Sequence, residues 1–282
     1  MRWRTGRRSS NVEDRRGMRV SRAGLAGGGI GTIVIALIAM YFGVDPRIVM
    51  QNSPTESTVT SSQPVLPEQQ ELADFVSVVL ADTEDTWHQL FRDMNGEYQE
   101  PRLILFSGAV ESACGFAQSA VGPFYCPADQ NVYIDLSFYD DLRKRFRAPG
   151  DFAQAYVVAH EIGHHVQTLL GISEQVHAAQ GRAAKAEANA LSVRMELQAD
   201  CLAGVWAHHA DRARGIVEAG DIEEALNAAS AIGDDRLQRQ AGGYVTPDSF
   251  THGSSAQRMR WFRQGMKAGT FEACDTFSAA QL

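Results

Sequence analysis

The chain has 282 residues, of which 44% are hydrophobic and 21% charged, and its formal net charge is −8 at pH 7. This composition is typical of a globular protein and excludes a disordered, fibrous or multi-span membrane protein. Residues 1–22 hold eight arginines and two acidic residues, a net charge of +6, so the remaining residues carry −14. The acidic body argues against nucleic acid as a partner, because phosphate binding needs clustered Lys and Arg.

Residues 23–44 carry no charge and are long enough to cross a bilayer as one helix. The positive charge before them and the acidic body after them predict a single-pass membrane protein with a cytoplasmic N-terminus. The Arg-rich segment 1–22 is then cytoplasmic, 23–44 is a transmembrane anchor in contact with lipid, and the rest is periplasmic or extracellular. A cleaved signal peptide is the alternative, but the apolar run ends in Met40-Tyr41-Phe42-Gly43 and not at a small-residue cleavage site.

Residues 45–70 hold four of the nine prolines and many Ser, Thr and Gln, which is typical of a linker. The folded domain is expected over 71–282. Apolar residues at helical spacing predict a first helix that ends at Asn95-Gly96. Strands are predicted at 102–106 and 132–136, and helices at about 137–146, 150–170, 186–211, 221–240 and 255–268. Few strands followed by many helices predict an α+β, mainly helical domain with a small sheet.

All four cysteines, Cys114, Cys126, Cys201 and Cys274, follow the apolar run. An even number in a domain that faces an oxidising compartment indicates two disulfides. Three pairings are open, and the sequence does not choose among them. In one of them Cys114 and Cys126 close a short loop, and Cys201 holds the C-terminal tail at Cys274. No pair has the close spacing of a cysteine zinc site.

Residues 160–164 read His-Glu-Ile-Gly-His within a predicted helix. Positions i and i+4 share a helix face, so His160 and His164 are expected to bind one Zn²⁺ ion. Zinc lowers the pKa of a bound water to about 7, and Glu161 is expected to act as its general base. The alternative is a core helix that happens to hold two histidines, which is weak because these groups are costly to bury without a metal.

Glu196 and Asp200 are also four residues apart on a predicted helix, among apolar neighbours. Buried carboxylates need partners. Glu196 is therefore expected as the third zinc ligand, and Asp200 as the acceptor for the other ring N–H of His160. The alternative is an ordinary exposed acidic pair with no role.

The order His-Glu-x-x-His followed by Glu-x-x-x-Asp matches the gluzincin arrangement. The runs AHEIGHHVQ, ELQADC, GPFYCP and VYIDLSF resemble the bacterial YpfJ-type family of neutral zinc metallopeptidases, and so does NVEDRRG in the Arg-rich segment. This resemblance covers most of the chain. It implies a zincin-like domain with one Zn²⁺ ion per chain that hydrolyses a protein or peptide substrate.

The segment from Thr251 to Arg258 resembles the part of HtpX-type zinc proteases in which a His follows a Thr and an Arg comes six residues later. The likeness implies that His252 donates a hydrogen bond to the oxyanion and that Arg258 braces the site. Gly253 stands where a Pro usually follows the His, which leaves the loop geometry open. The alternative is a surface histidine beside a helix N-cap at Ser254 or Ser255.

The strand at 132–136 has two readings of equal weight. It is either an edge strand that pairs with substrate backbone, with Tyr133 or Asp135 facing the cleft, or an ordinary interior strand.

The sequence thus predicts a membrane-anchored zinc endopeptidase. The main alternative is a non-catalytic extracytoplasmic scaffold or regulator with a structural or vestigial zinc site. A peptidase that cuts peptidoglycan cross-links ranks lower, because no wall-binding module is recognisable.

Overall fold

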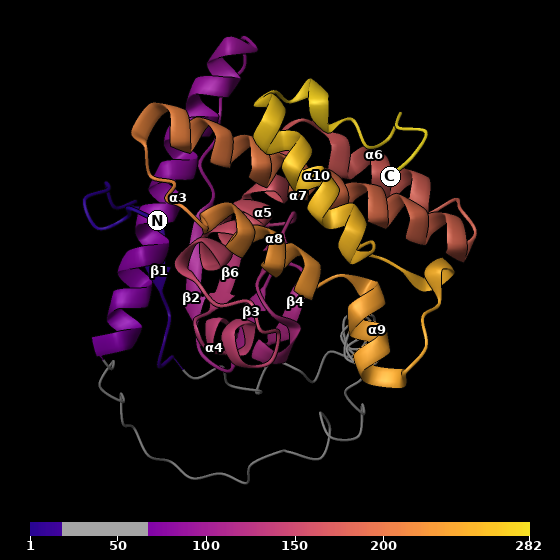
Figure 1. Ribbon diagram of the computed structural model, residues 1–282, viewed down its shortest axis with the longest axis horizontal. Helices are drawn as coiled ribbons and strands as arrows, with labels where there is room; N and C mark the ends of the chain where they lie inside the picture. The colour runs from indigo at the N-terminus through magenta and orange to yellow at the C-terminus, as the bar shows by residue number, and fades with distance from the viewer. Residues whose placement is uncertain (19–66) are drawn as a thin grey trace, which may run out of the picture.

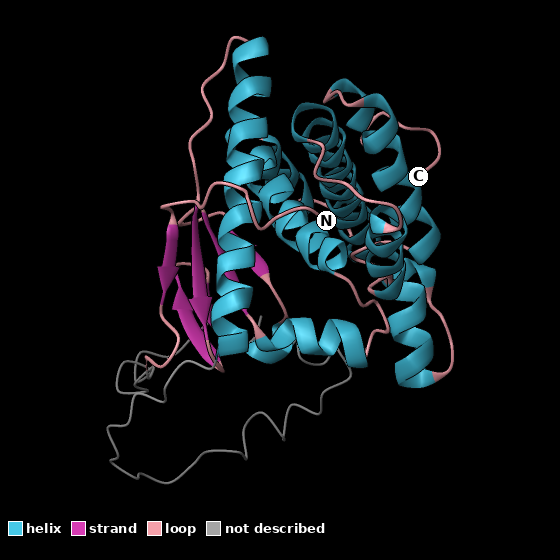
Figure 2. Ribbon diagram, turned by 60° about the vertical axis from the view of Figure 1, so that its left-hand side comes forward, coloured by secondary structure: helices cyan, strands magenta, loops and turns pink. Residues whose placement is uncertain are grey.

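The computed structural model describes residues 1–18 and 67–282 (Figure 1). Within these ranges the fold is α+β and mainly helical, with helices packed beside a small sheet (Figure 2). The helices are α3 (Pro67–Asp93), α4 (Ser137–Lys144), α5 (Asp151–Leu169), α6 (Ile172–Gln180), α7 (Lys185–Arg214), α8 (Asp221–Ala231), α9 (Asp234–Gly242) and α10 (Ser255–Ala268).

The strands form two sheets. They are β1 (Val12–Asp14), β2 (Arg102–Phe106), β3 (Ala109–Ser112), β4 (Gly115–Gln118), β5 (Phe124–Cys126) and β6 (Asn131–Asp135). The larger sheet has the order β1-β2-β6-β5, in which β5 alone runs antiparallel to its neighbour. The hairpin of β3 and β4 forms the smaller sheet.

The predicted elements at 102–106, 150–170 and 255–268 agree closely with β2, α5 and α10. The helix predicted at 221–240 is wrong as one element, because the chain leaves helical geometry at Gly233 and continues as α9. A Cβ at Gly233 would lie 2.4 Å from the backbone nitrogen of Ser255, so the close approach of these two loops requires glycine. Helix α6 and the short strands β1, β3, β4 and β5 were not predicted.

Residues 1–18 pack against the domain that the sequence analysis placed at 71–282. Strand β1 lies parallel to β2, with Val12 opposite Leu103 and Asp14 opposite Leu105. Both parts therefore belong to one folded unit. The predicted anchor at 23–44 falls outside the described residues, and none of the described helices has the length and apolar character needed to span a membrane.

The four cysteines form two disulfides, Cys114–Cys126 and Cys201–Cys274. The first closes a short loop across β4 and the end of β5. The second fastens the C-terminal tail to the middle of α7. This is one of the three pairings left open by the sequence.

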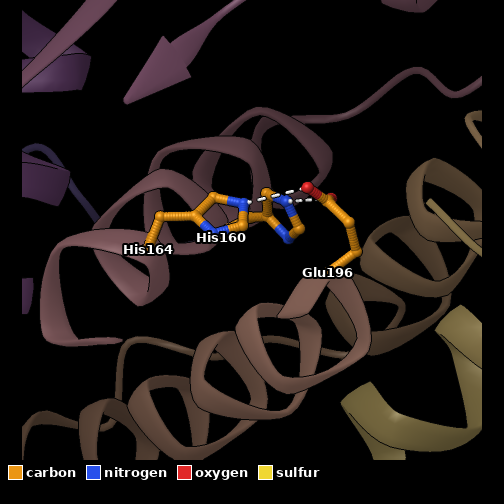
Figure 3. Close-up of side chains that lie close together, drawn as sticks. All are labelled: His160, His164 and Glu196. Carbon is orange, nitrogen blue, oxygen red and sulfur yellow. Dashed lines mark hydrogen bonds and ion pairs between the residues drawn. The ribbon is translucent and has the colours of Figure 1, made fainter. Parts of the chain in front are cut away.

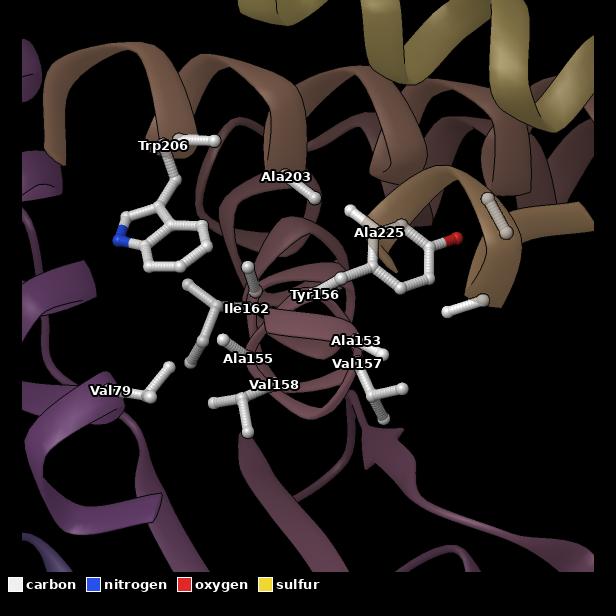
Figure 4. Packing of buried hydrophobic residues seen from close by; sticks show 14 of the residues in the cluster. Val79, Ala153, Ala155, Tyr156, Val157, Val158, Ile162, Ala203, Trp206 and Ala225 are labelled. Carbon is white, nitrogen blue, oxygen red and sulfur yellow. The ribbon is translucent and has the colours of Figure 1, made fainter. Parts of the chain in front are cut away.

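Helix α5 runs through the middle of the core. Its apolar side chains are buried on every side, as expected for a central helix. In Figure 4, Ile162 of α5 lies toward Val79 of α3, and Tyr156 lies on the side of α8. The stacked rings of Phe152 and Trp206 join α5 to α7, with centroids 5.7 Å apart.

Helices α7 and α10 approach each other through two glycines. A Cβ at Gly204 would lie 2.1 Å from the carbonyl oxygen of Phe262, and a Cβ at Gly265 would lie 1.9 Å from that of Cys201. Both positions have ordinary helical backbone, so glycine is needed here for the close contact and not for its conformation.

Replacing Gly265 with Ala is expected to lower the free energy of unfolding by roughly 1–3 kcal/mol, because the added methyl group forces the two helices apart. Gly181→Ala is the control, since a Cβ there meets nothing closer than 3.6 Å. Chemical denaturation of both variants measures the difference. Equal stability of the two variants would contradict the close packing.

Candidate metal centre

Two helices bring the three predicted zinc ligands together. His160 and His164 lie one turn apart on α5, and Glu196 faces them from α7 (Figure 3). The Nε2 atom of His160 is 3.2 Å from one Glu196 carboxylate oxygen, and that of His164 is 3.4 Å from the other. One ligand atom from each residue lies within 4.8 Å of the others. Two imidazoles and one carboxylate are a donor set that suits zinc.

The glycine of the His-Glu-Ile-Gly-His run explains how α7 comes so close. A Cβ at Gly163 would lie 3.0 Å from both the Cα and the carbonyl oxygen of Ala199. The contact places the turn of α7 that carries Glu196 against the turn of α5 that carries the two histidines. A larger residue at position 163 would increase the distance between the ligands.

The second nitrogen of each imidazole has its own acceptor. His160 Nδ1 lies 2.9 Å from Asp200 Oδ1, and His164 Nδ1 lies 2.9 Å from Gln167 Oε1. With a proton on each Nδ1, the Nε2 lone pairs point at the Glu196 carboxylate. Lone pairs that face a carboxylate are stabilised by a cation between them, so the residues present fit a zinc ion.

Asp200 lies at the centre of a fully buried network. The guanidinium of Arg258 donates to both of its oxygens, at 2.8 and 2.9 Å, and the Tyr156 hydroxyl donates to Oδ1. Burial raises the pKa of Asp200, but the charges of Arg258 and His160 outweigh burial and hold the pKa below its usual value. Asp200 therefore stays ionised and holds the ring of His160 in position, and Arg258 acts on the site through Asp200.

Glu161 follows His160 on α5, and only 8% of its surface is exposed. Burial raises the pKa of its carboxyl group, although the nearby histidines oppose this. A carboxyl group with a raised pKa is suited to accepting and releasing a proton near neutral pH. Its position beside the ligands is the one that the sequence predicts for a general base.

His252 lies in the loop between α9 and α10. Asp234 holds this loop, because its Oδ2 atom accepts the backbone N–H groups of Thr251, His252 and Gly253 at 2.7, 2.7 and 3.1 Å. Burial lowers the pKa of His252, but the charges of Glu196 and Asp234 and a hydrogen bond to Asp234 raise it overall. Of the three candidate ligands, Glu196 is therefore the one whose charge raises the pKa of the His252 imidazole.

The backbone conformation after His252 explains why glycine stands at position 253. Gly253 has φ 88°, a left-handed value that Pro cannot adopt. The helix N-cap that supported the alternative reading is also present, because Ser254 forms a capping box with Gln257 at the start of α10. The cap holds the loop at the start of α10. It is compatible with an effect of the Glu196 charge on His252, so the two readings of this segment do not exclude each other.

A cleft of about 270 Å³ opens beside the ligands. His164 and Glu196 line it together with Tyr125 and Pro127 from the end of β5 and with residues of α6 and α7. Burial raises the pKa of Tyr125 to about 12, so its hydroxyl keeps its proton. Its oxygen lies 3.1 Å from Nδ1 of His165.

The strand that borders this cleft is β5 and not the one proposed from the sequence. Strand β6 lies between β2 and β5, so its reading as an edge strand is wrong and its reading as an interior strand is correct. Tyr133 stacks on Phe124 and donates to Asp129, and Asp135 accepts the backbone N–H groups of Gly108 and Ser137. Both side chains are occupied by structural contacts.

Three residues of the site were not singled out in the sequence. Tyr156 lies four residues before His160, and Gln167 lies three residues after His164, so helical spacing could have identified both. Asp234 carries no comparable local signal, because it approaches His252 only through the tertiary fold.

Comparison with known proteins shows the family of the chain. The family model described as "Putative neutral zinc metallopeptidase" matches residues 1–277. The chain is 52% identical to the Escherichia coli K12 protein named "Uncharacterized protein YpfJ" over 285 residues, which is 98% of this chain and 99% of the relative. An uncharacterized protein of Mycobacterium tuberculosis H37Rv is 42% identical over 259 residues, 86% of each chain. No solved structure matches. The chain belongs to this zinc metallopeptidase family.

Replacing Gln167 with Ala is expected to weaken zinc binding about tenfold or more, because His164 then loses the acceptor for its Nδ1 proton. Gln167→Glu keeps an acceptor oxygen but loses the donor to the Met195 carbonyl. Zinc affinity should fall in the Ala variant and recover in the Glu variant, as measured by competition with a chromophoric chelator. Unchanged affinity in the Ala variant would contradict the role of Gln167.

Proposed function

We propose that the protein is a membrane-attached zinc endopeptidase that hydrolyses peptide bonds in proteins or peptides. The observation that carries the proposal is the arrangement of His160, His164 and Glu196 beside an open cleft, with the buried carboxyl of Glu161 next to them. Membership of the family supports a zinc peptidase at the level of enzyme class.

One zinc ion per chain would be held by His160, His164 and Glu196. Zinc in such a site supplies a Lewis acid that polarises a carbonyl and makes water a stronger nucleophile. Asp200 and Gln167 hold the two imidazoles so that Nε2 of each is directed at the same point. Arg258 and Tyr156 keep Asp200 ionised and fixed.

Glu161 takes the proton of the attacking water and delivers it to the leaving amine. Burial raises the pKa of the carboxyl group and so brings it closer to neutral pH. A group with a pKa near the working pH can both accept the proton from water and release it to the amine. His252 donates a hydrogen bond to the developing oxyanion and is positioned for this by Asp234.

The shape of the protein beside the centre suits an extended peptide. Strand β5 is the last strand of the sheet order within the described residues, so substrate backbone can pair with its free edge. A second pocket, of about 570 Å³, shares Val176 with the cleft. It is lined mainly by apolar residues of α6, α7 and the C-terminal tail, with Glu272 and Asp275 also in its lining. We propose that this pocket receives an apolar side chain of the substrate.

Residues 23–44 are proposed to attach the protein to the bacterial inner membrane, with the domain on the periplasmic or extracellular side. Their lack of charge supports the attachment. The two disulfides support the location of the domain, because such bonds persist in oxidising compartments.

Replacing Glu161 with Gln is expected to lower the hydrolysis of a quenched peptide library by about 10²–10⁴-fold, because the amide cannot accept the proton. Zinc content should stay near that of the unmodified protein. His160→Ala combined with His164→Ala is the control that loses the metal. Equal hydrolysis by the Gln variant would rule out the mechanism. A zinc-loaded protein that cleaves no peptide, and whose domain melts on chelation, would favour the scaffold.

Replacing His252 with Gln is expected to lower kcat by about 10²–10³-fold with little change in KM and zinc content, because the hydrogen bond forms mainly in the transition state. His177→Gln is the matched control, since His177 also lines the cleft but is exposed. Steady-state kinetics separate the two effects. A change in KM alone would show that His252 binds substrate without stabilising the oxyanion.

A further inference from the structure

The first 18 residues, called here the N-terminal segment, lie along α3 and β2. Besides the pairing of β1 with β2, the backbone N–H of Ser9 donates to the carbonyl of Ser77, and the Ser77 hydroxyl donates back to the carbonyl of Ser9. These contacts bind the segment at two separate places, one on a helix and one at the edge of the sheet.

The strongest contact is made by Glu84, in the middle of α3. Its side chain is almost fully buried. The hydrogen-bond partners of its carboxylate are Arg7 at 2.9 Å, Ser9 at 2.5 Å and Asn11 at 2.9 Å. A buried carboxylate is strongly destabilising when its partners are removed. Among the described residues, the hydrogen-bond partners of this carboxylate on α3 therefore come from the N-terminal segment.

The arginines of the segment also match the acidic outer face of α3. Arg4 pairs with Glu71 at 2.5 Å, Arg7 with Asp85 at 2.8 Å and Arg8 with Asp74 at 3.0 Å. Such exposed pairs are individually weak. Arg2 also pairs with Glu218, at 3.5 Å, so four of the eight arginines in residues 1–22 have acidic partners in the folded domain.

We propose that the N-terminal segment is a permanent part of the domain and that both lie on the same side of the membrane. A single crossing by 23–44 would place about 30 Å of hydrocarbon between Glu84 and its partners. Residues 18 and 67 therefore lie on the same side of the membrane. This replaces the predicted cytoplasmic N-terminus and does not depend on the proposed peptidase activity.

The side of each part can be measured in cells with the full-length chain. The described residues contain no free cysteine, so Thr5→Cys and Ala280→Cys each add one reactive thiol at an exposed position. Spheroplasts of a Gram-negative host expressing either variant are treated with a membrane-impermeant maleimide before or after lysis. A cytoplasmic thiol protein of the host reports leakage.

Equal labelling of the two variants before lysis supports the proposal, and so does labelling of both only after lysis. Labelling of Ala280→Cys before lysis, with labelling of Thr5→Cys only after lysis, would overturn it and restore the single-pass topology.

A second measurement tests the contact itself in the purified full-length protein. Arg7→Met removes a partner of buried Glu84 and is expected to lower Tm by about 5 °C or more. Arg8→Met is the matched control, because its side chain is exposed and its partner is the exposed carboxylate of Asp74. Glu84→Gln combined with Arg7→Met should restore part of the loss. Equal Tm values for the two single variants would show that the segment is not docked.

Discussion

Asp200 has no exposure to solvent, and its two oxygens join three helices that are distant in sequence. It lies on α7, accepts hydrogen bonds from Tyr156 and His160 on α5, and forms an ion pair with Arg258 on α10. A buried ion pair of this kind contributes little net stability, but the loss of one partner is strongly destabilising. The three helices are therefore held in one relative arrangement, and the positions of all three metal ligands follow from it.

Three glycines allow these helices to pack closely against one another. Gly163 lets α5 approach α7, and Gly204 and Gly265 let α7 approach α10. The same residues bring backbone close to backbone near Asp200, and the side chains of Asp200 and Arg258 are buried. Burial strengthens the interaction of Arg258 with Asp200 and so helps to keep the carboxylate charged. The close helix packing and the ion pair of Asp200 with Arg258 therefore involve neighbouring turns of α5, α7 and α10.

The grouping of the candidate metal ligands was predictable because its signal is local. His160 and His164, like Glu196 and Asp200, are four residues apart on a helix, so one turn of regular structure places each pair on a common face. The division of 221–240 into two helices depends on Gly233, which contacts Ser255 of a distant loop. Helix α6 begins after a left-handed turn at Gly171 whose hydrogen bonds are local.

The role of the N-terminal segment could not be predicted because its partners are far away in sequence. Val12 pairs with Leu103, and Arg7 reaches Glu84 across 77 residues. Without these contacts, a cluster of arginines before an apolar run has the form of a membrane topology signal. In the folded chain, Arg4, Arg7 and Arg8 of this cluster pair with acidic residues of α3.

The link between the C-terminal disulfide and the ligand His164 has a consequence for the timing of biosynthesis. Cys274 accepts a hydrogen bond from Gln198, Gln198 accepts one from Gln167, and Gln167 in turn holds the ring of His164. The ribosome must therefore add residue 274 before this support is complete. A chain that is still being synthesised carries both histidines of the motif long before it can hold them in their final orientation.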